Sequence, residues 1–185
     1  MFRAVTFIRA SLPSPPKKKG VSMKKIRFLL VLLLLFLVAC ARSPRDQAAK
    51  ELGLNLAYGE EISSFDTHSG NGDGTTFLAL KLHDDAVEAS IRSDHSWQSF
   101  PLDRTAQTLV YGRTDGTDTV GPYLCDTEGH ALVPKIHRGY YTLIDRQATN
   151  EKTKNADLLA RHSLNFTIGL YDSDTKILYY YKLDT

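Results

Sequence analysis

The chain has 185 residues, with 23 Lys and Arg against 21 Asp and Glu and a formal charge of +2. The charges are unevenly spread, because no acid precedes Cys40, while the part after it has 15 bases, 21 acids and a formal charge of −6. A mildly acidic segment without a Lys/Arg cluster argues against nucleic-acid binding, which requires such clusters to neutralise phosphates. About 145 residues suffice for one buried core, so one domain is expected there.

The N-terminal part has the layout of an export signal. Lys24, Lys25 and Arg27 precede an unbroken apolar run from Phe28 to Ala39. Positive charges before a short apolar run are typical of secretory signals. The run has roughly a dozen residues, whereas a membrane-spanning helix needs about 20. A signal that is removed is therefore favoured over a permanent transmembrane helix.

The end of this run, Leu37-Val38-Ala39-Cys40, resembles the lipobox of bacterial lipoproteins. The resemblance implies that the Cys40 thiol carries a lipid, that the signal is cut just before it, and that the protein is anchored at the extracytoplasmic face of the cell membrane. The alternative is an ordinary cleaved signal that contains a cysteine. The Pro-rich stretch before Met23 fits a signal poorly, because proline breaks helices, so either translation starts at Met23 or the basic region is unusually long.

The predicted organisation is an export signal over 1–39, a lipid anchor with a short helix over 40–53, and one globular domain over 54–185. Ser43 followed by Pro44 is a helix-start pattern, good helix formers run to Leu52, and Gly53 is a natural stop. So little chain separates Cys40 from this helix that we expect the domain close to the membrane. A frayed helix acting as a spacer is the alternative.

The next segments predict a hairpin and a helix. Residues 62–65 form a weak strand candidate, a Gly-rich turn cluster follows, and 75–82 alternates with period two. The alternation places Phe77 and Ala79 on one face and Leu78, Leu80 and Leu82 on the other, which indicates a β-hairpin. Residues 84–92 predict a short helix with acids in its first turn, where the helix dipole favours them.

The middle of the chain gives weaker signals. Segment by segment, the expectations are irregular structure over 93–103, a helix or a strand over 105–112, a surface loop over 113–121, a hairpin made by 132–136 and 140–145, a polar loop over 147–156, and a helical turn at 158–159.

The C-terminal segment predicts the clearest hairpin. Leu164, Phe166, Ile168 and Leu170 alternate along 163–171, turn residues follow, and 176–183 alternates in the same way. The sum predicts an α+β fold: one small domain with a mostly antiparallel sheet of about six strands and two or three short helices.

Few residues suggest chemistry. The turn from Ser69 to Gly74 has oxygen spacing like the start of a calcium loop, but the acid required at loop position twelve is replaced by Leu80. None of the six histidines has zinc-site spacing. Cys125 lies five residues before His130, yet sequence proximity does not establish an activated thiol. We therefore predict no metal site, no cofactor and no catalytic residue.

Aromatic residues are the remaining binding candidates. Tyr140 and Tyr180 lie on predicted strands, and Trp97, the only tryptophan, lies on a predicted loop. An aromatic side chain exposed on a sheet can contact a protein partner or a sugar ring. The alternative is that these side chains pack between strands.

Beyond the lipobox, three segments resemble a set of small lipoproteins of Gram-positive bacteria: Gly72-Asp73-Gly74-Thr75-Thr76-Phe77, Gly121-Pro122-Tyr123-Leu124 and Asn165-Phe166-Thr167. The resemblance implies a location but no activity. The sequence thus favours a lipid-anchored, non-enzymatic binding or interaction domain at the cell surface, with an envelope protein or a glycan as partner. The alternatives are a small cell-envelope hydrolase and an inhibitor or immunity-type lipoprotein.

Overall fold

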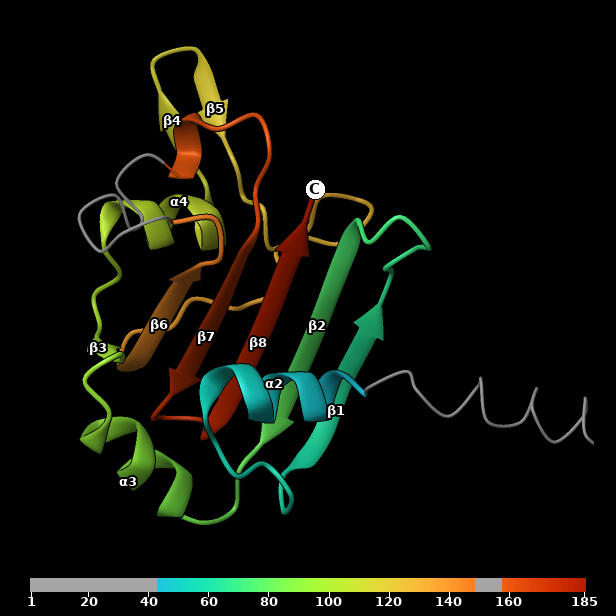
Figure 1. The fold of residues 1–185 in the computed structure, drawn as a ribbon. Coiled ribbons are helices and arrows are strands. Elements are labelled where there is room, and N and C mark those ends of the chain that lie inside the picture. Colours follow the sequence, from blue (N-terminus) through green and yellow to red (C-terminus); the bar gives the residue numbers. More distant parts are fainter. Residues whose placement is uncertain (1–42, 149–157) are drawn as a thin grey trace, which may run out of the picture. The chain divides into compact units, whose positions relative to one another are not determined.

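A six-stranded antiparallel sheet forms the centre of the described part of the chain (Figure 1). The computed structural model describes residues 43–148 and 158–185. The strand order is β1-β2-β8-β7-β6-β3. In that order the strands are β1 (Glu60–Asp66), β2 (Gly74–Lys81), β8 (Ile177–Asp184), β7 (Phe166–Asp172), β6 (Gly139–Asp145) and β3 (Gln98–Ser99). The predicted α+β fold class is confirmed.

Two hairpins that are far apart in sequence make up most of the sheet. β1 pairs with β2, and β7 pairs with β8, as the alternating patterns predict. The two hairpins join through β2 and β8, with Phe77 opposite Tyr181. This register places the C-terminal strand in the middle of the sheet.

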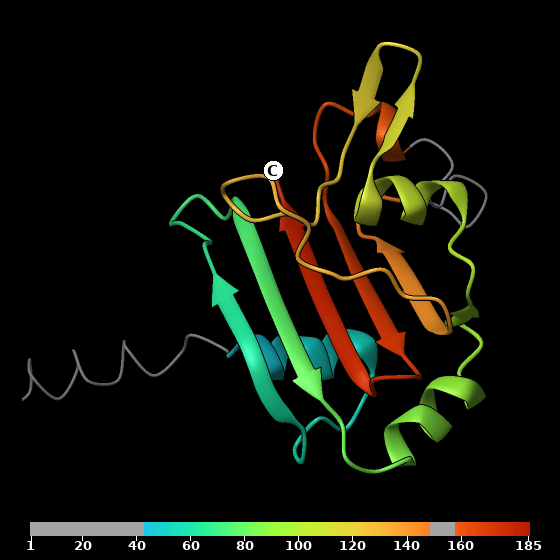
Figure 2. The same ribbon diagram turned by 180° about the vertical axis from the view of Figure 1, so that it is seen from behind.

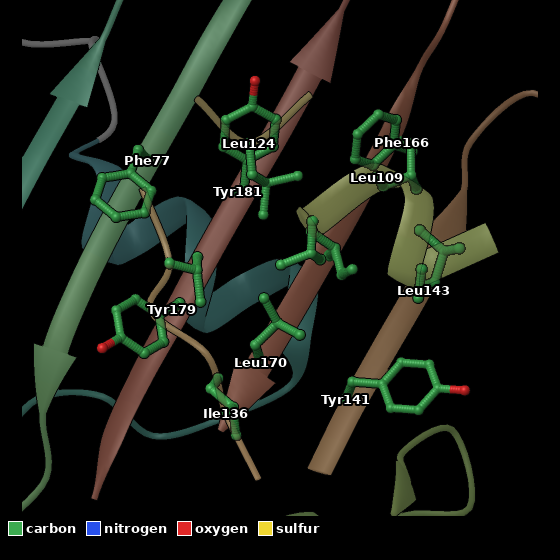
Figure 3. Packing of buried hydrophobic residues seen from close by; sticks show 14 of the residues in the cluster. Phe77, Leu109, Leu124, Ile136, Tyr141, Leu143, Phe166, Leu170, Tyr179 and Tyr181 are labelled. Atoms are coloured by element: carbon green, nitrogen blue, oxygen red, sulfur yellow. The ribbon is translucent and has the colours of Figure 1, made fainter. Parts of the chain in front are cut away.

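Both faces of the sheet are covered, by different parts of the chain. Helix α2 (Pro44–Leu52) crosses one face, and helix α4 (Arg104–Tyr111) and segment 121–138 lie over the other (Figures 1 and 2). The face under α4 carries Phe77, Leu170 and Tyr181, which belong to one core cluster with Leu109 and Leu124 (Figure 3). Because the strands alternate, neighbouring residues of β2, β7 and β8 belong to separate cores on the two faces.

Helix α2 is part of the folded domain. It begins as predicted, because the Ser43 hydroxyl accepts a hydrogen bond from the amide of Asp46 at 3.1 Å. It ends at Gly53, whose φ of 66° is a left-handed conformation that glycine adopts readily. Ala48 and Leu52 are buried against the sheet. The helix is therefore docked, and the alternative of a frayed spacer does not hold.

The predicted hairpin between 132–136 and 140–145 is wrong. β6 pairs with β7 and with the two-residue strand β3 instead. Residues 132–136 form no strand; Val133 and Ile136 point into the core under α4. The side chain of Tyr111 holds this segment, because its hydroxyl donates to Pro134 O at 2.9 Å and accepts from Ile136 N at 3.0 Å.

The remaining elements show which structure the weaker sequence signals adopt. Residues 105–111 belong to helix α4, where the Asp103 carboxylate accepts from the amide of Ala106 at 2.8 Å, and Gly112 follows the helix as its C-cap. The expected loop over 113–121 contains a small hairpin of β4 (Arg113–Asp115) and β5 (Asp118–Val120). The helix expected over 84–92 is α3 (Ala86–Ser93), and the helical turn at 158–159 is η1 (Leu158–Ala160). The export signal, Cys40 and most of the 147–156 loop lie outside the described residues.

Candidate functional site

Three cavities adjoin helix α3, at the end of the sheet near β3. Their volumes are about 370, 320 and 180 Å³. Helix α3 is attached through Val87 and Ile91, which are buried in the core under α2. Every residue of α3 except Ile91 and Ser93 lines at least one of the three cavities, so we take α3 and its surroundings as the candidate functional site.

The largest cavity contains one of the three predicted binding residues, and we call it the Tyr140 pocket. The ring of Tyr140 is partly buried, and the guanidinium of Arg92 lies over it at 5.9 Å from the ring centroid. This cation–π contact fixes the Tyr140 ring beside α3. The pocket is lined by Glu88, Arg92, Ser99, Phe100, His137, Arg138, Gly139, Tyr140 and Ser173.

Glu88 is held at the base of this site by two partners. Its side chain is 13% exposed and accepts hydrogen bonds from Arg92, at 2.5 Å, and from the hydroxyl of Tyr171, at 3.0 Å. Burial, together with the neighbouring Glu88 carboxylate, raises the pKa of Tyr171, so its hydroxyl remains a donor. The 320 Å³ cavity also touches Glu88 and Arg92, so the Glu88–Arg92 pair forms part of the walls of both cavities.

Several polar groups that line the Tyr140 pocket have hydrogen-bonding capacity that none of the described protein groups uses. Arg138 donates through Nε and Nη2 to one oxygen of Asp174, which leaves its other N–H groups free. Within the described ranges, the side chains of His137, Ser99 and Ser173 have no hydrogen-bond partner. The pocket therefore offers several donors to a ligand.

The smallest cavity lies on the other side of α3, and we call it the Tyr58 pocket. It is lined by Asn55, Tyr58, Gly59, Leu82, His83, Asp84, Ala86, Val87 and Ser90. Tyr58 is 81% exposed, which is unusual for so large a ring. Sequence reasoning missed this residue, because it lies between α2 and β1 where no period marks it.

Two of the three aromatic residues predicted to bind a partner, Trp97 and Tyr180, are buried in the core. Tyr180 is fully buried under α2, where its hydroxyl donates to Glu51 at 3.0 Å. Burial and the charge of Glu51 raise the pKa of Tyr180. Trp97 is 7% exposed, and its indole nitrogen has no hydrogen-bond partner. The idea that Trp97 and Tyr180 present exposed aromatic surface is therefore corrected: both pack in the core.

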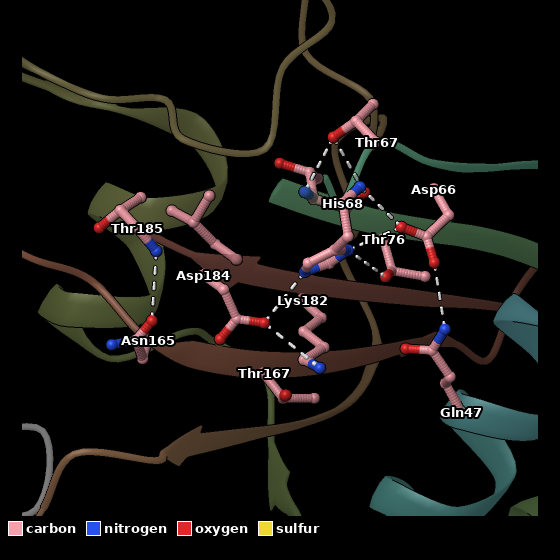
Figure 4. Close-up of polar contacts among 12 residues, drawn as sticks. Gln47, Asp66, Thr67, His68, Thr76, Asn165, Thr167, Lys182, Asp184 and Thr185 are labelled. Carbon is pink, nitrogen blue, oxygen red and sulfur yellow. Dashed lines mark hydrogen bonds and ion pairs between the residues drawn. The ribbon is translucent and has the colours of Figure 1, made fainter. Parts of the chain in front are cut away.

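A network of polar side chains joins β1 and β8, and His68 lies at its centre (Figure 4). Its Nδ1 is 2.6 Å from Asp66 Oδ1 and its Nε2 is 3.0 Å from Asp184 Oδ2. Each ring nitrogen therefore faces one carboxylate oxygen. Asp184 is also paired with Lys182, and Asp66 accepts from Gln47 of α2. We name these residues the His68 network.

The network holds its two aspartates ionised. Burial alone would raise the pKa of Asp184, but hydrogen bonds from His68 and Arg146 and the charges of Arg146 and Lys182 hold it below the ordinary value of 3.8. Burial acts in the same way on Asp66, and hydrogen bonds from His68 and Gln47 outweigh it, so that this pKa is also lowered.

The remaining candidates for chemistry are separate. Cys125 is a half-buried free thiol, while His130 contacts Asp126 and Glu128, and no interaction joins Cys125 to His130. In residues 43–148 and 158–185, no group of three His, Cys, Asp or Glu side chains is placed to hold a metal ion. None of the helices described there is long and apolar enough to span a membrane.

Comparison with known proteins adds no assignment to this geometry: no protein-family model, no curated protein and no solved structure matches the chain.

Proposed function

We propose that the protein is a lipid-anchored, non-enzymatic binding domain of the cell envelope, and that its ligand carries a carboxylate or phosphate group bound in the Tyr140 pocket. The lipobox-like segment ending at Cys40 supports the anchor and the location. The observation that carries the ligand class is the presence of two guanidinium groups, Arg92 and Arg138, in the wall of one cavity.

Arginine suits this role because its planar N–H groups bind carboxylate and phosphate oxygens with good geometry. Arg92 and Arg138 are each paired with one carboxylate, Glu88 and Asp174. These pairs orient the guanidinium groups and use only part of their donors. His137 and two serine hydroxyls can complete the hydrogen bonds to an anionic group.

The surrounding chemistry supports binding over hydrolysis. A hydrolase that forms a covalent intermediate needs a nucleophile in contact with a base that is free to take its proton. The ring nitrogens of His68 both face carboxylates, and no hydrogen bond joins the Cys125 thiol to the His130 ring among the described residues. His137, Ser99 and Ser173 line the Tyr140 pocket, but among the described residues no hydrogen bond joins the histidine to either serine.

The test is a titration of the full isotope-labelled chain in detergent micelles with phosphate, glucuronate and glucose, followed by amide NMR. We expect phosphate and glucuronate to shift the amides of Ser99, Gly139 and Ser173, and glucose to leave them unchanged. Arg138→Gln should weaken phosphate binding roughly tenfold, because one charge-assisted contact is lost.

The matched control is Arg104→Gln, because Arg104 is exposed and lies outside the pocket. It should leave phosphate binding unchanged. Equal weakening by both substitutions would indicate non-specific charge attraction and would contradict the proposed site. The absence of any saturable shift with phosphate or glucuronate would contradict it as well.

A further inference from the structure

Tyr58 combines high exposure with a position at a cavity. At 81% exposed, it is the most exposed large hydrophobic side chain in the described ranges, where Ile62, at 55%, is the only other one. A tyrosine offers a broad apolar face and a polar hydroxyl, and such side chains are frequent in recognition sites. The position of Tyr58 in the wall of a cavity therefore suggests a ligand that stacks on its ring.

The rest of the cavity adds a small apolar wall and a polar rim. Leu82 and Val87, both nearly buried, supply the apolar part. The polar residues are Asn55, His83, Asp84 and Ser90. A sugar ring has the matching pattern, because its C–H groups form an apolar face and its hydroxyl groups form a polar edge. A purely apolar side chain would leave the polar rim without partners.

Internal contacts orient these polar groups and leave part of each one free. Asn55 Oδ1 accepts from Ala57 N at 3.2 Å, which leaves the amide NH₂ group. Asp84 Oδ1 accepts from Ala86 N at 3.2 Å, which leaves Oδ2. Ser90 donates to Ala86 O at 2.9 Å, which leaves its oxygen as an acceptor. The cavity thus presents both a donor and acceptors, as a set of sugar hydroxyls requires.

The charge and the volume of the Tyr58 pocket further restrict the class of ligand that it can bind. No Lys or Arg is among the residues that line this cavity, and Asp84 lies there with Glu60 beside His83. An anionic ligand is therefore disfavoured, in contrast to the Tyr140 pocket. A volume of about 180 Å³ is below the range of roughly 300–1,000 Å³ typical of pockets for larger ligands. A single ring suits this space.

We propose that the Tyr58 pocket is a binding site for one uncharged sugar ring, which stacks on Tyr58 and hydrogen-bonds to Asn55, Asp84 and Ser90. This site is independent of the anionic ligand proposed for the Tyr140 pocket, because the two pockets share no lining residue. Weak, ring-specific binding is expected from so small a contact area.

The test is amide NMR on the full labelled chain in micelles, titrated with glucose, N-acetylglucosamine and glucuronate. At least one of the two neutral sugars should give saturable shifts at Tyr58, Gly59 and Ser90, and glucuronate should bind there more weakly. Tyr58→Ala should weaken binding by roughly tenfold, and Tyr58→Phe should retain it, because stacking needs only the ring.

Ile62→Ala is the control, because it removes the other exposed apolar side chain but does not line the cavity. Unchanged binding by Tyr58→Ala, or no saturable shift from either neutral sugar up to about 50 mM, would overturn the proposal. The two proposed sites can fail separately: Arg138→Gln should not affect neutral sugars, and Tyr58→Ala should not affect phosphate.

Discussion

The hydroxyl of Tyr180 in β8 donates a hydrogen bond to Oε2 of Glu51 in α2, at 3.0 Å. The same oxygen accepts from Thr167 of β7 at 2.6 Å, and Lys182 lies 3.7 Å from the other oxygen of Glu51. One carboxylate therefore joins the helix to two central strands. The tyrosine ring is fully buried at this point.

Tyr180→Phe should lower the free energy of unfolding by about 1–2 kcal/mol, because a buried hydrogen bond to a carboxylate is lost while the ring keeps its packing. Urea unfolding of the full chain in detergent measures this. Tyr58→Phe is the control and should change stability by less than about 0.5 kcal/mol, since that side chain is exposed. Equal effects of the two substitutions would show that the Glu51 contact contributes no stability.

Gly169→Ala should destabilise the protein by roughly 1–3 kcal/mol, the usual effect of overpacking. Gly169 lies in β7 beneath α2, and a Cβ placed on it would be 2.9 Å from Leu52 Cδ2 and 2.9 Å from Trp97 Cη2. The added methyl group would push against both side chains. Thermal or urea unfolding measures the change.

A double-mutant cycle tests the cause. Leu52→Ala alone should cost about 2–5 kcal/mol through the cavity it leaves. In that background, Gly169→Ala should cost less than in the wild type, because the new methyl group has room toward α2. Strictly additive effects would show that the clash is with Trp97 or that the helix shifts to avoid it.

Stability should fall as the pH drops below about 4. The pKa values of Asp66 and Asp184 are lowered in the fold from the ordinary value of 3.8. A carboxyl whose folded pKa is lower than its unfolded one binds more protons when unfolded, so its contribution is complete above the unfolded pKa and is lost as pH falls through the folded pKa.

Urea titrations between pH 2.5 and 7 measure this dependence. Asp184→Asn should lower stability at pH 7 and flatten the acid-side slope, since it removes a partly buried carboxyl group whose pKa is lowered in the fold. Asp118→Asn, in the β4–β5 hairpin and exposed, is the control and should leave the slope unchanged. An unaltered slope in Asp184→Asn would contradict the assignment to the His68 network.

Cys40→Ala should abolish incorporation of a tagged fatty acid in cells that express the full chain, if the Cys40 thiol is the lipid acceptor, as we propose from the lipobox-like segment. Metabolic labelling followed by gel fluorescence measures it. Cys125→Ala is the control and should label as the wild type does. Equal labelling of Cys40→Ala and wild type would contradict the proposed anchor.

Local patterns were sufficient to predict the two long hairpins and α2. Period-two alternation in 75–82 and 163–171 identifies both faces of the sheet, because neighbouring side chains point to opposite sides. Ser43 and Gly53 mark the ends of α2 through capping chemistry that depends on adjacent residues only. Such features need no knowledge of the rest of the fold.

Features that depend on distant contacts were missed. Leu132, Val133 and Ile136 give an apolar segment close in sequence to 140–145, but β7 already pairs with β6. Tyr111 instead holds 134–136 in irregular structure over the core. The alternation in 176–183 makes Tyr180 a candidate for an exposed aromatic residue, whereas α2 covers that face of the sheet and buries it.

The candidate site was only partly predictable for the same reason. Tyr140 was singled out as an aromatic residue on a strand, and it lies in a cavity wall. Its partners Arg92 and Arg138 come from α3 and from the segment before β6, so only the fold brings them together. Tyr58 gives no sequence signal, because exposure is decided by what packs against it.

Because α2 is docked on the sheet, the chain between Cys40 and the folded domain is very short. Only Ala41 and Arg42 separate Cys40 from the capping Ser43, and two extended residues reach roughly 7 Å. With a lipid on Cys40, so short a connection would raise the effective concentration of the domain toward ligands on the same surface. Binding to such ligands would then need less intrinsic affinity than binding to the same ligands free in solution.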